Sequence, residues 1–538
     1  MSQIFSCFLL ILVIFSCAVQ QRPQGGPKDV DPPKLLKATP ANSTRNFKAQ
    51  EIRLDFDEYF KLNNQYSEIS VFPAPEKNPD YKKHGKTLII DLKDTLLKNT
   101  TYVINFGKAI GDVNENNIVK NFTYVFSTGN HIDSLTMSGT VTNNETGLKE
   151  KDATVMIFTL KQDSLLFGKK KPSLYTTTDS VGNFRITNLK EGVYKIYALK
   201  EKTPDKIYDA DDELIAFSTR LINFTKDTSN IMLRLFRQTP AKFRVDRKFL
   251  TDGSMQFIFN KALTKPSIKI IYPDGLDAQK IVETSKTKDT LTVYSKNMDF
   301  DSVRFAIYDN NKIVDTTYLR KLRKESYTRN LTFRYGITLA SQLKTGSDLK
   351  VYANMPIDNF EPALIALKED STVVKYTISK DTGAASKVLS IKYPWKAKAS
   401  YQLVMQDAAV TDIYGDKSKQ QTKKFNITPP DAYTNLAITV TVPVPGKSYV
   451  VELLDEHGVA IRSDIIKQKS VLSYRNIYVG KFTLRAVYDN NNNGKWDSGS
   501  IQENRQPESI WVYNKQFILR PNWDTEETVE IPKEVVLP

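Results

Sequence analysis

Oxygen-bearing side chains at alternate positions single out one stretch near the end of this chain, YDNNNNGKWDSG. Counted from its first aspartate, carboxylate or amide oxygens come at positions one, three, five and nine, from Asp489, Asn491, Asn493 and Asp497. Ca²⁺ takes oxygen ligands at this spacing, with a glycine at position six and a bidentate glutamate at position twelve. Gly494 supplies the glycine, but position twelve is Ser500 and the next acid is Glu503. The stretch therefore predicts a weak Ca²⁺ site, and a polar turn is the alternative.

An internal repeat bears on that choice. The segment GVYKIYALKEKTPDKIYD, which starts at Gly192, aligns without gaps with GKFTLRAVYDNNNNGKWD, which starts at Gly480. The two copies share apolar strand positions and an aromatic residue followed by aspartate, but the earlier copy lacks the asparagines and the glycine of the loop. The comparison favours a structural turn, with metal as an addition in the second copy.

Groups for covalent or acid–base catalysis are scarce. The three histidines, His84, His131 and His457, lie far apart, and no motif places one of them beside a serine nucleophile. Both cysteines fall within the first 17 residues, so the folded domains contain no thiol for catalysis, disulfides or metal binding. We therefore expect a protein that is not an enzyme.

The N-terminal segment MSQIFSCFLLILVIFSC has the apolar length of a signal peptide and is short for a membrane span. Its end, Ile14-Phe15-Ser16-Cys17, resembles a bacterial lipobox, which implies removal of residues 1–16 and acylation of Cys17, with palmitate among the acyl chains. An ordinary secretory signal is the alternative. Residues 17–33, rich in Gly and Pro, predict a flexible tether and resemble that of Bacteroidota lipoproteins. The resemblance implies lipid anchoring in the outer membrane, on the periplasmic or the cell-surface side.

The alternation of apolar and polar residues predicts an all-β chain of tandem sandwiches. EIRLDFDEYF alternates Ile52, Leu54 and Phe56 with polar residues, and TYVINF, SYVVELL and KFTLRAVY are interpreted in the same way. The length of 538 residues predicts several domains. Residues 34–129 resemble a bacterial Ig-like domain of the S-layer type, with Tyr102 expected to fix the loop before its strand through its hydroxyl. Residues 130–236 resemble a carboxypeptidase regulatory-like, prealbumin-type sandwich through Asp179, Gly182 and Phe184.

Three more sandwiches are expected, over residues 237–324, 325–428 and 429–538. The fourth weakly repeats the first, with Tyr401 in the place of Tyr102 and Asp412 near that of Asp112, and the fifth repeats the second. Asp112, in DVNENN, is expected to form a turn. The order of the repeats indicates duplication of an Ig-like and a regulatory-like pair.

The net charge of +15 belongs to the exported part of the chain. For an exported protein this charge favours anionic lipid, acidic glycan or an acidic protein surface over nucleic acid. We expect a binding or scaffolding subunit of an envelope complex that contains a β-barrel protein of the outer membrane. The alternative is a glycan-binding or adhesive surface protein that uses Trp496, Trp511 and Trp523, although core packing is the favoured role of these residues.

Short Asp-Ser and Asp-Thr sequences resemble the O-glycan acceptor pattern of Bacteroidota exported proteins. The resemblance implies four candidate acceptors, Ser134, Ser164, Thr290 and Ser302. A turn at the entry to a strand is the alternative explanation of each.

Overall fold

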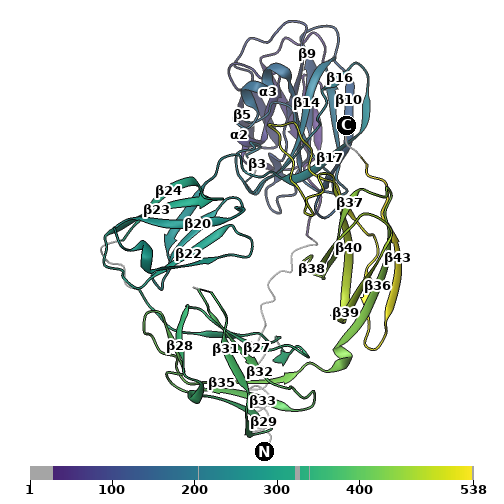
Figure 1. Cartoon of the computed structure of the whole chain (residues 1–538). Helices are drawn as coiled ribbons and strands as arrows, with labels where there is room; N and C mark the ends of the chain where they lie inside the picture. The colour runs from purple at the N-terminus through teal and green to yellow at the C-terminus, as the bar shows by residue number, and fades with distance from the viewer. Residues whose placement is uncertain (1–27, 204, 322–326, 339, 384, 536–538) are drawn as a thin grey trace, which may run out of the picture. The chain divides into compact units, whose positions relative to one another are not determined.

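The computed structural model describes residues 28–203, 205–321, 327–338, 340–383 and 385–535. Strands make up nearly all of its regular structure, which confirms the all-β prediction (Figure 1). The contacts group the chain into two compact units. The first holds residues up to Leu235 except two short segments, Asn143–Leu148 and Ala210–Ile215, which belong to the second unit. The division into five domains stays a prediction, and the strands are described below in that order.

The first domain packs two sheets around a shared core. One sheet has the order β1 (Leu35–Thr39), β2 (Glu51–Phe56), β6 (Thr87–Asp91), β5 (Asp80–His84), and the other has the order β4 (Ser70–Phe72), β7 (Thr101–Asn105), β9 (Thr123–Ser127). The short strands β3 (Phe60–Leu62) and β8 (Ile110–Asp112) pair with each other, and α2 spans Gln65–Glu68. The alternation predicted for β2 is confirmed, because Ile52, Leu54 and Phe56 are buried. In contrast, all five residues of β7 are buried.

The second domain continues the pattern with longer strands. They are β10 (Leu135–Asn143), β11 (Thr154–Thr159), β12 (Tyr175–Thr177), β13 (Asn183–Leu189), β14 (Gly192–Lys200), β15 (Leu214–Phe217), β16 (Ile222–Phe224) and β17 (Thr228–Arg237). β11 pairs with β12 on one side and β14 on the other, which leaves β12 at an edge of the sheet. Helix α3 (Leu160–Leu166) begins with a capping box between Thr159 and Gln162.

The third and fourth domains are also sandwiches. The third has one sheet of β18 (Val245–Phe249), β19 (Met255–Phe259), β22 (Thr290–Ser295) and β21 (Lys280–Thr284), and another of β20 (Pro266–Tyr272), β23 (Ser302–Asp309) and β24 (Lys312–Arg320). The fourth contains β25 (Phe333–Tyr335), β26 (Gln342–Leu343), β27 (Leu349–Ala353), β28 (Ile357–Phe360), β29 (Ile365–Glu369), β30 (Thr372–Val374), β31 (Thr377–Lys380), β32 (Val388–Lys392), β33 (Ser400–Met405), β34 (Val410–Asp412) and β35 (Gln421–Ile427). Short 3₁₀ turns span Asp277–Gln279, Pro362–Leu364 and Pro430–Ala432.

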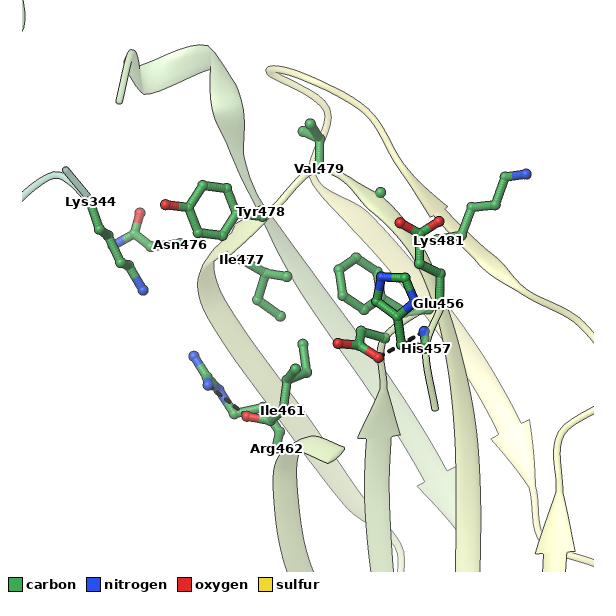
Figure 2. A pocket seen from close by; sticks show the side chains of 13 residues that line it. Lys344, Glu456, His457, Ile461, Arg462, Asn476, Ile477, Tyr478, Val479 and Lys481 are labelled. Carbon is green, nitrogen blue, oxygen red and sulfur yellow. Dashed lines mark hydrogen bonds between the residues drawn. The ribbon is translucent and has the colours of Figure 1, made fainter. Parts of the chain in front are cut away.

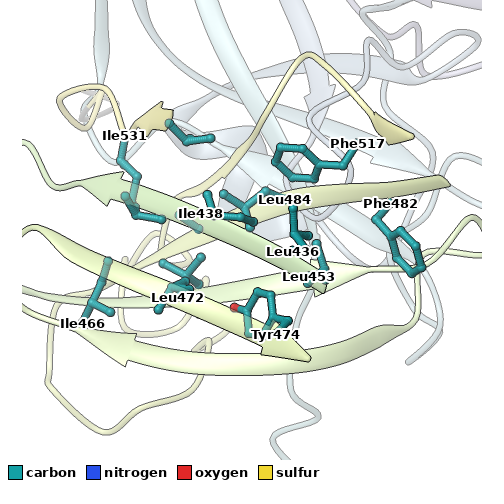
Figure 3. Packing of buried hydrophobic residues seen from close by; sticks show 14 of the residues in the cluster. Leu436, Ile438, Leu453, Ile466, Leu472, Tyr474, Phe482, Leu484, Phe517 and Ile531 are labelled. Carbon is teal, nitrogen blue, oxygen red and sulfur yellow. The ribbon is translucent and has the colours of Figure 1, made fainter. Parts of the chain in front are cut away.

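The fifth domain packs a sheet of β39 (Ser470–Tyr478), β36 (Tyr433–Thr441) and β43 (Thr525–Glu530) on a sheet of β38 (Ala460–Ile466), β37 (Ser448–Leu454), β40 (Gly480–Asp489), β41 (Ile510–Val512) and β42 (Phe517–Leu519). Figure 3 shows the core between them, with Leu436, Ile438, Leu453 and Leu484 at its centre. Strand β37 departs from the predicted alternation because it lies between two other strands and six of its seven residues are buried.

Burial patterns agree with both proposed repeats. The aligned strand residues Tyr194, Ile196, Ala198 and Leu199 are buried, and so are Phe482, Leu484, Ala486 and Val487 at the matching positions. In the other pair of repeats, the hydroxyl oxygen of Tyr102 accepts the Leu97 N–H at 2.9 Å, and that of Tyr401 accepts the Lys396 N–H at 2.7 Å. The expected role of Tyr102 is therefore confirmed, and Tyr401 reproduces it with the same five-residue spacing.

No helix among the described residues is long and apolar enough to span a membrane.

Candidate functional site

The loop predicted to bind Ca²⁺ follows β40, and its oxygen atoms are already hydrogen-bonded. Asp489 is 2% exposed, and its carboxylate accepts the Ser448 hydroxyl at 2.7 Å and the N–H groups of Asn493 and Gly494 at 3.0 Å. Burial alone would raise the pKa of Asp489, but these hydrogen bonds hold it below its usual value. The carboxylate therefore acts as the organising acceptor of the turn.

The two asparagines of the loop are oriented by their side-chain oxygens. Asn491 Oδ1 accepts the Asn493 N–H at 3.1 Å, and Asn493 Oδ1 accepts the Lys495 N–H at 3.0 Å. Their side-chain N–H groups consequently point to Asp497, whose Oδ2 accepts both of them. Ca²⁺ would need those amide oxygens, so binding would have to replace contacts within the loop. Calcium binding at this loop stays a prediction.

Glu508 completes the loop and was missed in the sequence. Its carboxylate, 8% exposed, accepts the Asn490 N–H at 2.7 Å and the Asp497 N–H at 3.0 Å. Burial raises its pKa, the two N–H groups oppose that shift, and the nearby Asp497 and Asp489 add to it. Glu503, the acid that follows the loop most closely, instead pairs with Arg505 at 3.0 Å on the surface. The spacing of ligands in a calcium loop does not predict Glu508, because a further turn lies between Asp497 and this residue in the sequence.

Within the ranges that the structure describes, no group of three or more His, Cys, Asp or Glu side chains is arranged to hold a metal ion.

Asp112 and Asp412 organise similar turns in the two Ig-like sequences. Asp112 accepts the N–H groups of the three residues from Glu115 to Asn117, as the turn prediction expects. Asp412 accepts the N–H groups of Tyr414 and Asp416 through Oδ1. Burial raises the pKa of Asp412, and its two N–H bonds only partly offset this. The pKa of Asp112 is lowered, because its larger set of N–H donors outweighs burial.

The three tryptophans named as sugar platforms differ in their surroundings. Trp511 packs against the core of the fifth domain, and the Trp496 indole N–H donates to the Glu508 carbonyl at 2.9 Å. Trp523 is 68% exposed, so core packing is wrong for this residue. It lies in a turn before β43, where a large apolar side chain is free to contact a ligand.

A cavity of about 360 Å³ opens in the fifth domain (Figure 2). The turn between β37 and β38 and the hairpin between β39 and β40 contribute most of its lining. Ile461, Ile477 and Phe482 supply apolar surface, while Glu456 and Lys481 bring opposite charges to it. Asp455, His457 and Arg462 also line it, so the cavity combines an apolar floor with several charged or polar side chains. The residues come from separate stretches of sequence, so no motif marks the cavity.

A buried ion pair joins the first and second domains within the first unit. Lys206, which follows β14, donates from Nζ to Glu68 Oε1 on α2 at 2.9 Å. The two side chains are 3% and 9% exposed. Glu68 Oε2 also accepts the Lys108 N–H at 3.0 Å, and the Tyr175 hydroxyl donates to the Glu68 carbonyl. The carboxylate and ammonium groups are thus removed from water together.

Side-chain amides of the first domain bind the edge strand β12 of the second. Asn105 donates to the Tyr175 carbonyl at 2.5 Å. Asn121 donates to the Thr177 carbonyl at 3.0 Å and accepts the Thr177 N–H at 3.1 Å. The Asn105 contact accounts for the burial of the last residue of β7. We call the contacts of β12, Glu68 and Lys206 the interdomain seam.

Lys171 lies beside the seam and donates from Nζ to the carbonyls of Tyr66 and Ile69, at 3.2 and 2.6 Å. Burial lowers its pKa to about 8, helped by repulsion from Lys206 and opposed by attraction to Glu68. The seam therefore places two lysines near one carboxylate.

The predicted modification sites have different surroundings. Cys17 and the signal peptide lie outside the described residues. Ser134 and Ser164 are exposed, while Thr290 and Ser302 are partly buried at the starts of β22 and β23. Thr290 Oγ1 donates to Asp289 at 3.1 Å, as in a strand-entry turn. Modification at all five positions stays a prediction.

Comparison with solved structures finds similarity to other β-rich proteins. The major pilin subunit BcpA of Bacillus cereus has 10% identity and a TM-score of 0.14, over 74% of this chain and 99% of the pilin. Domains 1–6 of the surface layer protein SbsC have 10% identity and a TM-score of 0.14, over 91% of this chain and 67% of that protein. The MG0-NIE-MG1 part of Escherichia coli alpha-2-macroglobulin has 12% identity and a TM-score of 0.13, over 54% of this chain and 96% of that fragment. TM-scores this low carry no argument about function.

A comparison with curated proteins finds no match. Among family models, that of the bacterial Ig-like domain, Big_5, matches residues 29–128. This range contains the first sandwich with Tyr102 and Asp112, and it agrees with the resemblance found for residues 34–129. The chain therefore contains a bacterial Ig-like domain at residues 29–128.

Proposed function

We propose that this protein is a non-enzymatic lipoprotein, anchored in the outer membrane through Cys17, that serves as a binding or scaffolding subunit of an envelope complex. A non-enzymatic scaffold or adhesive role fits the Ig-like domain and the tandem sandwiches. The partner that we propose is a β-barrel protein of the same membrane. Anchoring would keep the domains close to such a partner without a transmembrane segment.

The observation that carries the non-enzymatic part is the use of the buried carboxylates. Asp112 and Asp489 each accept at least two hydrogen bonds from backbone N–H groups of their own turns, through both carboxylate oxygens. A carboxylate held in this way shapes a loop and has little freedom to exchange protons with a substrate. The interdomain seam supports the scaffolding part, because a scaffold must hold its domains in a fixed relation.

A pull-down tests the proposal. A C-terminally tagged chain is purified from detergent-solubilised membranes, with Cys17→Ala as the matched variant that cannot be acylated. We expect a barrel protein in stoichiometric amount with the unmutated chain and its loss with Cys17→Ala. Recovery of a clean monomer from both would contradict the scaffold, and membrane attachment that persists in Cys17→Ala would contradict the anchor.

Glycan binding is the second candidate function, and the exposure of Trp523 favours it. A glycan array probed with the unmutated chain and with Trp523→Ala tests this candidate. Binding that is lost with Trp523→Ala supports it, while equal signals from both proteins exclude this tryptophan as the platform.

A further inference from the structure

The third domain contains a three-stranded sheet of β20, β23 and β24 (Figure 1). Its strand register places side chains in rows on the outer face. The register places Tyr272, Arg304 and Tyr318 in one row across β20, β23 and β24. The next two rows are Lys269, Ala306 and Thr316, and Ser267, Tyr308 and Ile313. Residues between them, such as Ile268, Phe305 and Ile307, point into the core. We call the outer set of three rows the tyrosine face.

Large side chains on the tyrosine face are open to solvent. Tyr272 is 53% exposed, Tyr318 is 56% exposed and Ile313 is 61% exposed. Surface tyrosines of this exposure gain little for folding, since their rings remain in water. Several of them together on one sheet therefore indicate a binding surface.

Cations hold two of the rings in place. The Arg247 guanidinium lies 5.5 Å from the centre of the Tyr318 ring, and its Nε donates to the Tyr318 carbonyl at 2.9 Å. Lys269 Nζ lies 5.7 Å from the centre of the Tyr308 ring. Contacts of this kind reduce the entropy that the rings would lose on binding a ligand.

The charge of the third domain points to an anionic ligand. Residues 237–324 contain 18 Lys and Arg and 10 Asp and Glu, a net charge of +8 out of +15 for the chain. The tyrosine face itself carries Lys269 and Arg304 and no acidic side chain among its three rows. A positive field attracts an anion, but it does not by itself distinguish a glycan from a protein.

The row of Tyr272, Arg304 and Tyr318 makes that distinction. Tyr272 and Tyr318 are separated by two strand spacings, about 10 Å, with Arg304 between them. A sugar ring has C–H groups on its faces, which stack on aromatic rings, and an acidic sugar carries its charge at the rim. The row thus matches consecutive sugars of an anionic chain, and the hydroxyls of Ser267 and Thr316 are available for sugar hydroxyls.

We propose that the tyrosine face binds an acidic polysaccharide. Tyr272 and Tyr318 stack on sugar rings, and Arg304 and Lys269 pair with carboxylate or sulfate groups. This inference extends the second candidate function, glycan binding, by naming the tyrosine face as the binding surface and acidic polysaccharides as the ligands. It requires neither the lipid anchor nor a barrel partner, so its failure would leave the scaffold proposal intact.

Affinity electrophoresis of the full chain tests the proposal, with polygalacturonate or chondroitin sulfate in the gel and neutral dextran as the reference. We expect retardation by at least one acidic polymer and none by dextran. Tyr272→Ala combined with Tyr318→Ala should weaken binding about 10-fold, and Tyr318→Phe should retain it because the ring remains. Arg304→Gln should weaken binding more than Lys286→Gln, which removes the same charge from an exposed turn of the same domain.

Four results would overturn the proposal. They are no retardation by either acidic polymer, equal retardation by dextran, equal effects of Arg304→Gln and Lys286→Gln, and unchanged binding when both tyrosines are replaced. Poly-L-glutamate and vesicles with anionic lipid are run in parallel. Stronger binding to the polypeptide would replace the glycan with an acidic protein partner, and stronger binding to the vesicles would replace it with a membrane surface. Thermal unfolding of each variant shows whether the third domain has kept its fold.

Discussion

The buried ion pair of the interdomain seam gives the sharpest prediction about stability. Lys206→Met removes the ammonium group but keeps a side chain of similar length. Glu68 then remains as a carboxylate whose side chain is 9% exposed and that has lost the ammonium group to which it was hydrogen-bonded at 2.9 Å, while Lys171 stays nearby. A buried charge that loses its hydrogen-bonded counter-charge either bears the cost of desolvation or takes up a proton.

The size of the effect follows from what remains around Glu68. Breaking a buried pair by removing one partner costs about 3–5 kcal/mol. Because Glu68 Oε2 keeps the Lys108 N–H, we expect the lower end, about 3 kcal/mol. For a folding unit of this size, 1 kcal/mol corresponds to about 2–4 °C, so the unfolding temperature of the first unit should fall by about 6–12 °C.

Differential scanning calorimetry of the full chain measures this shift, with Lys161→Met as an exposed control in the same domain. Glu68→Gln combined with Lys206→Met removes both charges and should recover most of the loss, to within about 1 kcal/mol of the unmutated chain. If Lys206→Met shifts the transition no more than Lys161→Met does, or if the double variant is no more stable than Lys206→Met, the electrostatic explanation of the seam is wrong.

Four further predictions concern separate features. A Cβ at Gly107, where φ is +52°, would lie 2.6 Å from Glu68 Oε2, so Gly107→Ala should destabilise the first unit by about 2–4 kcal/mol in urea unfolding. Gly85→Ala, which meets no atom within 4 Å, should cost only about 1 kcal/mol. Since the pKa of Lys171 is about 8 in the folded chain and 10.5 is usual, the unfolded state holds more protons between these values. The free energy of unfolding of the unmutated chain, minus that of Lys171→Met, should therefore increase as the pH rises above 8. A difference that does not change with pH would refute this. Tyr102→Phe should cost about 1–2 kcal/mol by thermal unfolding, because the Leu97 N–H loses its acceptor. Each protein, Asp489→Ala and the unmutated chain, should unfold at the same temperature with calcium as with a chelator. A calcium-induced rise of the unfolding temperature in the unmutated chain alone would establish a metal site.

Local patterns in the sequence predicted much of the fold. The alternation of Ile52, Leu54 and Phe56 in β2 needs no knowledge of distant residues, because one face of a strand meets the core and the other meets water. The Tyr102 interaction was predictable for a similar reason, since the hydroxyl binds a residue only five positions earlier. The same reasoning fails for β37. This strand lies between two others in its sheet, and residues on both of its faces are buried.

Contacts between distant residues were not predictable in this way. Lys206 meets Glu68 across 138 positions, and the tyrosine face depends on the register of three strands. The candidate calcium loop was recognised from its spacing, but spacing does not reveal that its amide oxygens accept backbone N–H groups. Likewise, Glu508 returns to the loop through a turn that has no strong signature.

The edge strand β12 has a consequence for how the first two domains could have evolved. An uncovered edge strand offers free N–H and C=O groups to any other extended chain, and proteins usually protect such edges against aggregation. Here the protection comes from the neighbouring domain, because Asn105 and Asn121 occupy three backbone groups of β12. A gene rearrangement that moved the second domain alone would expose this edge. The two domains are therefore expected to be inherited as one piece, and copies of the second that lack the first should carry a charged residue or a proline at the position of β12.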